Sequence, residues 1–303
     1  MKQDAEKIFK ADRVELCTEC FGSAADPALL LIMGAMSSMI WWDEAFCWRL
    51  AGRGLFVIRF DNRDTGRSWE PGCPVYTAED MADDCVRVLD FWRVRRAHLL
   101  GMSLGGMLAQ IVTLKYPRRA LSMSCLASSV WAGAEPPLPE MDAKLLANSE
   151  RTRSIDWEDR EAAIDFMLTT GRLMCGGGRV FDEKRCRELS ELEFERARDL
   201  RSLQNYLNLG GGEAWWNRTA EIHVPVAVLH GTDDKVLPYP HGEALARAIP
   251  GAKLVTLEGA GHELHRDDWE QVIEAVHFCV TASSQAAASS QAAASGQAEG
   301  KPA

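Results

Sequence analysis

The chain has 303 residues, of which 47% are hydrophobic and 26% are charged, an ordinary composition for a globular protein. Its 34 basic and 44 acidic residues leave a net charge of −10, which argues against nucleic-acid binding because phosphate recognition needs a concentrated basic face. No apolar run reaches the roughly 18 residues of a membrane span, and the charged start does not resemble a secretory signal. The nine scattered cysteines are typical of reduced thiols, so we expect a cytoplasmic protein.

From residue 6 to residue 127, short apolar runs alternate with helical patterns. The apolar runs are continuous, as expected of strands buried on both faces, and they cover residues 29–33, 55–60, 97–100 and 121–126. The helical patterns between them cover residues 43–51, 78–92 and 104–116. Thr77 can cap the second of these helices, and Pro117 stops the third. This rhythm indicates βαβ units and predicts an α/β fold with a mainly parallel, doubly wound sheet.

The pattern changes between residues 131 and 216, where no run typical of a buried strand occurs. PPLP opens this segment, charged helical stretches such as 182–209 follow, and triple glycines stand at 176–178 and 210–212. The glycine runs lack the context of a phosphate-binding loop and are interpreted as loops or hinges. The βα rhythm then resumes with strands at 225–229 and 253–257 and helices at 242–249 and 268–280. We therefore expect a core made of residues 1–130 and 217–281, and a helical lid made of residues 131–216, hereafter the insertion.

The last residues of the chain form a repeat of Ser, Gln and Ala that begins near Ser283. The repeat has almost no charge and no large apolar side chain, so it buries too little surface to offset the entropy of ordering. An alanine-rich helix is the alternative, although it would have no apolar face with which to dock. We expect a disordered tail over residues 282–303.

The sharpest motif is the G-x-S-x-G pattern that runs from Gly101 to Gly105 and centres on Ser103. It follows a predicted strand and precedes a predicted helix, the context in which the glycines allow a tight turn and the serine projects at its apex. The alternative interpretation is a turn that only packs the helix on the sheet. The context favours Ser103 as a nucleophile.

A serine nucleophile needs a base, usually a histidine, and the histidine needs an orienting carboxylate. His262 lies in a glycine-containing loop after the strand at 253–257, where open α/β sheets place functional residues. His265 is a weaker candidate, and the remaining histidines are interpreted as packed or locally hydrogen-bonded. The carboxylate candidates are Asp233 and Asp234, which follow the strand at 225–229. Spacing alone does not choose between them.

The oxyanion that forms during attack on a carbonyl group needs two backbone N–H donors. One is expected from Leu104, the residue after the nucleophile. The second is expected from Ala35, in the loop after the strand at 29–33, where small residues let the backbone approach a substrate. An ordinary strand-exit turn is the alternative for this loop.

Two further patterns have structural interpretations. Cys17 and Cys20 form a CxxC pair with no second pair or histidine cluster nearby, so we expect neither a metal site nor a redox site there. The charged segment from Asp61 to Ser68 follows a predicted strand. It is interpreted as a buried network of ion pairs and turns.

These motifs together resemble those of an α/β-hydrolase. The resemblance covers about residues 14–280 and includes the strand exit at Met33–Ala35, the DNRDTGRS segment, the turn at Ser103, the aspartate loop and the His262 loop. Within that superfamily the chain is most similar to the aclacinomycin methylesterase-like group, which shares the pattern of residues 26–34, DNRDTGRS and PYPHG. The resemblance implies that Asp234 is the acid of the triad, and that neither a metal nor an organic cofactor takes part.

The prediction is therefore a serine hydrolase that cleaves methyl or short-chain carboxylic esters of small molecules through an acyl-enzyme. Ser103, His262 and Asp234 form the triad, and the N–H groups of Ala35 and Leu104 hold the oxyanion. The same fold also supports perhydrolase, thioesterase, C–C hydrolase and peptidase activities. A small-molecule receptor on a hydrolase scaffold is the alternative from a different functional class. The insertion does not match a pattern that names the substrate, and the sequence makes no prediction of oligomeric state.

Overall fold

The computed structural model describes residues 5–72, 75–131 and 137–298, with side chains described as far as residue 289. In this part of the chain eight strands form one sheet in the order β1-β2-β4-β3-β5-β6-β7-β8. The strands are β1 (Lys7–Ala11), β2 (Val14–Phe21), β3 (Ala28–Ile32), β4 (Phe56–Phe60), β5 (Ala97–Met102), β6 (Ala120–Leu126), β7 (Val226–Gly231) and β8 (Lys253–Leu257). β2 pairs antiparallel with both β1 and β4, and all the remaining pairings in this order, from β4–β3 to β7–β8, are parallel. The prediction of a mainly parallel, doubly wound sheet is confirmed.

Most of the helices occur where the periodicity predicts them. The α-helices are α1 (Glu44–Ala51), α2 (Ala78–Phe91), α3 (Leu104–Lys115), α4 (Ala143–Glu150), α5 (Arg160–Met174), α6 (Glu183–Arg196), α7 (Pro240–Ala248) and α8 (Trp269–Ala298). Short 3-10 helices are η1 (Met39–Trp41), η2 (Arg151–Arg153), η3 (Leu200–Asn208), η4 (Glu213–Trp215), η5 (Thr219–Glu221) and η6 (Arg266–Asp268). Thr77 caps α2 as predicted, with a full capping box to Asp80. The single helical stretch expected over 182–209 is instead split into α6 and η3.

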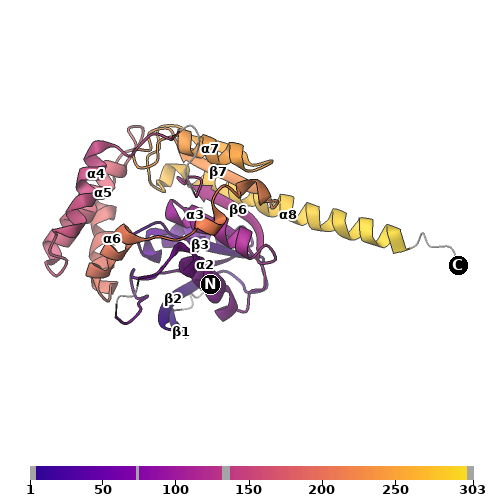
Figure 1. The fold of residues 1–303 in the computed structure, drawn as a ribbon, viewed down its shortest axis with the longest axis horizontal. Helices are drawn as coiled ribbons and strands as arrows, with labels where there is room; N and C mark the ends of the chain where they lie inside the picture. Colours follow the sequence, from indigo (N-terminus) through magenta and orange to yellow (C-terminus); the bar gives the residue numbers. More distant parts are fainter. Residues whose placement is uncertain (1–4, 73–74, 132–136, 299–303) are drawn as a thin grey trace.

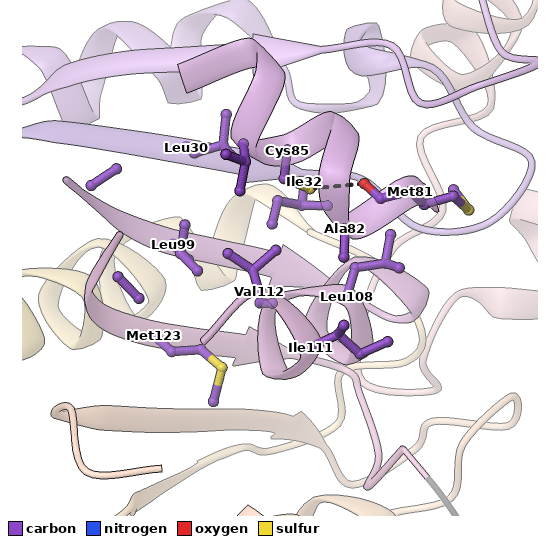
Figure 2. Close-up of a cluster of buried hydrophobic side chains, with 14 of the residues drawn as sticks. Leu30, Ile32, Met81, Ala82, Cys85, Leu99, Leu108, Ile111, Val112 and Met123 are labelled. Atoms are coloured by element: carbon purple, nitrogen blue, oxygen red, sulfur yellow. Dashed lines mark hydrogen bonds between the residues drawn. The ribbon is translucent and has the colours of Figure 1, made fainter. Parts of the chain in front are cut away.

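The central strands β3, β4 and β7 are buried along their whole length, because successive side chains point to opposite faces of the sheet and helices cover both faces. Leu30 and Ile32 of β3 pack in a cluster with α2 and α3, whereas Leu29 and Leu31 pack in a second cluster with α1 and α8. Figure 2 shows the first cluster, in which Leu30, Ile32 and Leu99 of the sheet face Met81 and Cys85 of α2 and Leu108 and Val112 of α3. Continuous apolar strands are thus explained by helices on each side.

The segment between β6 and β7 is helical in its described part, and α4, α5 and α6 lie together to one side of the sheet (Figure 1). Its helices have small hydrophobic clusters of their own, one around Trp157 and Phe166 and another around Ile164 and Leu168. Met36 and Trp41, which follow β3, pack against these clusters. The insertion therefore contacts the core at the loop that leaves β3.

The disordered tail expected over residues 282–303 is not what the structure has as far as Ala298, because α8 continues through the repeat to that residue. Alanine has the highest helix propensity, and a helix already docked on the sheet extends without a new nucleation step. From Ser284 to Ser289 the side chains are exposed, so this part of α8 projects from the body of the protein (Figure 1). Residues 299–303 lie outside the described residues.

Candidate active site

Ser103, Asp234 and His262 follow β5, β7 and β8, respectively. Because these strands are parallel, the three residues leave the same edge of the sheet, where α/β folds bind their ligands. The loop from Met33 to Met39, which leaves β3, begins at this edge as well. The topology therefore places all the residues predicted for the site along one edge.

Ser103 is held in an unusual backbone conformation between β5 and α3. Its φ of 53° and ψ of −120° lie outside the regions that non-glycine residues ordinarily adopt. Its N–H donates to the Leu126 carbonyl group at 2.9 Å, and its own carbonyl accepts from Ser128 Oγ at 2.8 Å. The Ser103 side chain makes no capping hydrogen bond to α3, although the residue occupies the cap position. This geometry directs the hydroxyl away from the capping role that serine usually has at a helix start.

The glycines of the motif are required by the closeness of neighbouring backbone. A Cβ atom at Gly101 would overlap the backbone of Gly105, and a Cβ atom at Gly105 would overlap the Ile32 carbonyl group. A Cβ atom at Gly106 would lie 2.5 Å from Ser128 Oγ. The G-x-S-x-G pattern is therefore explained as the packing of a sharp strand-to-helix turn against β3 and the end of β6.

His262 and Asp234 form a buried pair. His262 Nδ1 and Asp234 Oδ2 are 2.8 Å apart, and the two residues are 5% and 4% exposed. The N–H groups of Val236 and Leu237 donate to Asp234 Oδ1 at 2.8 and 2.9 Å. Burial alone would raise the pKa of Asp234, but the charge of His262 and hydrogen bonds from His230 and His262 outweigh burial and hold the pKa well below its usual range. Asp234 is therefore an anion that orients the imidazole.

The structure separates the two aspartates that spacing leaves open. Asp234 Oδ2 faces His262, whereas Asp233 Oδ2 accepts a hydrogen bond from the N–H of Gly177 at 2.9 Å. Asp233 is therefore turned toward the insertion. The geometry agrees with the choice of Asp234 that the family resemblance implies.

The loop after β3 lies against the serine. A Cβ atom at Gly34 would be 3.2 Å from Ser103 Cβ and 3.9 Å from Ser103 Oγ. Ala35 is the next residue, in an exposed turn, and Leu104 is the first residue of α3, so its N–H has no acceptor within the helix. Of the two residues predicted to hold an oxyanion, Leu104 therefore follows Ser103 directly in the chain, and Ala35 follows Gly34, which lies against the Ser103 side chain.

The insertion docks on the His262 loop through its backbone. The N–H of His262 donates to the Met174 carbonyl group at 2.9 Å, and the N–H of Gly178 donates to the Gly259 carbonyl group at 3.0 Å. A Cβ atom at Gly176 would overlap the backbone of Gly259 and Gly261. The first triple glycine is indeed a loop, but one fixed by close backbone packing on the loop that carries His262.

Three other histidines have polar partners outside the site. His265 Nε2 lies 3.2 Å from the Val180 carbonyl group, and His277 Nε2 lies 3.1 Å from the Arg53 carbonyl group. His98 is buried with Nδ1 at 2.8 Å from Ser122 Oγ, and burial lowers its pKa to about 4.

His230 also contacts the site, although the sequence analysis does not assign it there. Its Nε2 lies 3.4 Å from Asp234 Oδ2. The i, i+4 spacing of His230 and Asp234 is the signal that could have indicated it.

The charged segment after β4 is a buried network, as predicted. Arg63 pairs with Asp84 and, at 2.7 Å, with Glu70, and all three side chains are less than a tenth exposed. Asp61 is completely buried and pairs with Arg196 of α6 at 3.0 Å. This second pair joins the core to the insertion, a partner that the local sequence does not indicate.

Cys17 and Cys20 are buried in β2 and are not joined by a disulfide bond. Burial raises the pKa of the Cys17 thiol, which keeps it in the unreactive protonated form. Among the residues that the structure describes, no group of three or more His, Cys, Asp or Glu side chains is arranged to hold a metal ion. No helix in the described ranges is both long and apolar enough to cross a membrane.

Comparison with known proteins places this geometry in a family. Residues 23–268 match the family described as serine aminopeptidase S33. The chain belongs to this family. It is 32% identical to the Rhodomycin D methylesterase of Streptomyces sp. (strain C5), over 85% of this chain and 92% of the relative, and 32% identical to that of Streptomyces peucetius over the same shares. A solved hydrolase from Pseudomonas aeruginosa PA01 is 25% identical, with a TM-score of 0.68 over 90% of this chain and 97% of the other.

These findings confirm the predicted membership in the α/β-hydrolase superfamily and the similarity to the methylesterase group. The chain is thus a hydrolase of this superfamily, and the geometry described above belongs to an enzyme. The sequence predicted the elements that carry the site because each leaves a strand in a recognisable local pattern. It did not predict that Met174 contacts the His262 loop, or that Glu193 and Arg196 contact the loop after β3.

Proposed function

We propose that this enzyme hydrolyses carboxylic esters, with methyl or short-chain esters as substrates, through Ser103, His262 and Asp234. The observation that carries the proposal is the buried hydrogen bond between His262 and Asp234, on the sheet edge where Ser103 occupies a strained turn. The relatives named as methylesterases support the same chemistry. Small-molecule esters are therefore the partners that we expect.

In the proposed mechanism, Ser103 Oγ attacks the ester carbonyl while His262 Nε2 accepts its proton. Asp234 holds the imidazole through Nδ1 and stabilises the imidazolium that forms. The N–H groups of Ala35 and Leu104 stabilise the oxyanion, which is usually the largest single contribution to such catalysis. His262 then protonates the leaving alcohol, and a water molecule activated by His262 hydrolyses the acyl-enzyme.

The test is labelling of wild type and Ser103→Ala with a fluorescent fluorophosphonate, followed by intact-mass measurement and turnover of p-nitrophenyl acetate and of rhodomycin D. We expect a single adduct on the wild type and none on the variant, with a loss of at least about 10³-fold in kcat for the variant. Equal thermal stability of both proteins is the control for folding. Ester turnover retained by a folded Ser103→Ala enzyme would contradict the assignment.

The family description favours peptidase activity as a second candidate. Both reactions use the same triad, so the site geometry does not separate them. Turnover of amino-acid p-nitroanilides in preference to esters would support the peptidase. Binding of rhodomycin D with neither turnover nor labelling would instead support a receptor.

A further inference from the structure

Glu193 is a buried carboxyl group that the proposed mechanism does not use. It stands on α6 in the insertion, is 2% exposed and reaches into the core. Glu193 Oε2 accepts three hydrogen bonds, from Ser38 Oγ at 2.6 Å, from Ser38 N–H at 3.3 Å and from Trp41 Nε1 at 3.0 Å. Glu193 Oε1 is buried without a hydrogen-bond partner. A carboxyl group placed this way costs free energy, so a role is expected for it.

Ser38 belongs to the loop that lies against Ser103, and Trp41 belongs to η1, which follows that loop. This loop, from Met33 to Met39, is held at three points. Asn62 Nδ2 donates to the Met33 carbonyl group at 2.9 Å, and the Met39 N–H donates to Asp61 Oδ1 at 2.9 Å. Ser38 is held by Glu193, and Gly34 and Ala35 lie between these anchors. Of the three anchors, the one on Ser38 is supplied by the insertion rather than by the core.

Arg196, one turn after Glu193 on α6, completes the cluster. It donates to Ser38 Oγ at 3.1 Å and to Asp61 Oδ2 at 3.0 Å. The Ser38 hydroxyl therefore donates to Glu193 and accepts from Arg196, so both of its hydrogen-bonding roles are satisfied by α6. Such a fully directed hydroxyl fixes the position of its backbone more firmly than a single contact would.

We propose that Glu193 is a positioning residue for the ester hydrolysis proposed above, holding Ser38 so that the loop from Met33 to Met39 presents the Ala35 N–H beside Ser103. This inference rests on the proposed function, since it assigns the loop its part in that reaction. Glu193 acts only through Ser38 and Trp41 and does not touch the reacting atoms.

Burial and the neighbouring carboxyl groups favour the neutral form of Glu193 below about pH 7. Three carboxyl groups, those of Glu193, Asp61 and Glu6, share two cations, Arg196 and Arg67. The Cys17 thiol of β2 also faces this cluster, at 3.9 Å from Glu6, and it stays protonated. Burial raises the pKa of Glu193 to about 7, helped by the charge of Asp61 and opposed by the hydrogen bonds from Ser38 and by Arg196. Below that pH, a glutamine at this position would therefore preserve both the acceptor and the neutral state of the side chain.

The experiment compares Glu193→Ala, Glu193→Gln and the matched control Glu195→Gln, which makes the same substitution at an exposed position of α6. Each full-length protein is assayed for kcat and KM on p-nitrophenyl acetate and for its rate of fluorophosphonate labelling, with the melting temperature measured alongside. For Glu193→Ala we expect kcat and the labelling rate to fall by about 10- to 100-fold, with KM within about 3-fold, because a displaced N–H group weakens transition-state binding. Glu193→Gln restores kcat to near wild type, and Glu195→Gln leaves it unchanged.

A folded Glu193→Ala enzyme with wild-type kcat and labelling rate would overturn the inference. So would a Glu193→Gln enzyme as slow as Glu193→Ala, because the acceptor would then not be what matters. If Glu193→Ala does not fold, Ser38→Ala tests the same contact from the loop, with a fall in kcat expected and an unchanged kcat contradicting the inference. The proposed function fails separately, since its failure would appear as absent ester turnover and labelling in the wild type.

Discussion

The insertion contacts the candidate active site at two places, and the two contacts are made of different groups. On the side of the His262 loop, residues 174–178 dock with their backbone groups, which bond to the backbone of His262 and Gly259 and to the side chains of Asp233 and Glu263, and with glycines where side chains would overlap. On the loop after β3, Glu193 and Arg196 dock through buried ionisable side chains. The first contact depends on shape, whereas the second depends on a balance of charges.

This difference predicts how each contact responds to change. Hydrogen bonds between two backbone groups keep their donors and acceptors at every pH, so the bonds that join His262 to Met174 and Gly178 to Gly259 are sensitive to added volume and not to protonation. Buried ions are costly unless they are paired, so the charged contact is sensitive to the loss of one partner and to pH. Three experiments test the comparison.

The largest expected effect is on the charged contact. In Arg196→Met, the completely buried carboxylate of Asp61 loses the cation 3.0 Å away, and the volume of the side chain is nearly kept. We expect the free energy of unfolding to fall by about 3–5 kcal/mol, as measured by urea denaturation. Arg198→Met is the matched control, because Arg198 pairs with Glu15 at a solvent-exposed position and its loss costs about 0–1 kcal/mol. Equal losses in the two variants would show that the buried pair contributes no more to the free energy of unfolding than the exposed pair does.

The next effect is on the glycine contact. A Cβ atom at Gly176 would overlap backbone atoms of Gly259 and Gly261, whereas one at Gly177 would meet only the Asp233 side chain, at 2.9 Å. For Gly176→Ala we expect kcat to fall by about 10²-fold, because the displaced loop carries His262 away from Ser103. Gly177→Ala is the control, since the Asp233 side chain can rotate away. Steady-state kinetics on p-nitrophenyl acetate measures both variants, and similar kcat values would contradict a steric role for Gly176.

The two contacts also show which parts of the protein can be predicted from local sequence. The turn at Ser103 and the loops of Asp234 and His262 each follow a strand in a short pattern, so their place at one sheet edge could be predicted from βα rhythm. The partner of His262 could not be chosen by spacing, because Asp233 and Asp234 differ only in which way each side chain turns. The structure resolves this by turning Asp233 toward Gly177 of the insertion.

Glu193 and Gly176 could not be predicted for a different reason. Glu193 stands on a highly charged helix where Glu191 and Glu195 are chemically identical neighbours, and only the packing of α6 on the core distinguishes it. The first triple glycine looked like a flexible loop because glycine permits both freedom and close approach. The extension of α8 differs from the predicted disordered tail because the helix propensity of alanine prevails over the low hydrophobicity of the repeat.

The smallest expected effect is the pH dependence of stability that Glu193 contributes. Its pKa rises from an ordinary value of 4.5 in the unfolded chain to about 7 in the folded protein. Between these two values the folded state binds one proton more than the unfolded state, so stability falls as pH rises and the loss is complete above the folded pKa. Over the interval from pH 6 to pH 8 this group lowers the free energy of unfolding by about 1.4 kcal/mol.

The difference between wild type and Glu193→Gln isolates this contribution. Other groups titrate as well, and His98 has the opposite sign, because its lowered folded pKa means that the unfolded chain binds the extra proton below about pH 6.5. Such contributions are common to both proteins and cancel in the difference. Urea denaturation at several pH values should show the wild type losing stability relative to Glu193→Gln as pH rises, whereas Gly176→Ala should keep the wild-type slope. Parallel curves for wild type and Glu193→Gln would mean that Glu193 binds equal numbers of protons in the folded and unfolded states from pH 6 to pH 8, and would contradict the raised pKa.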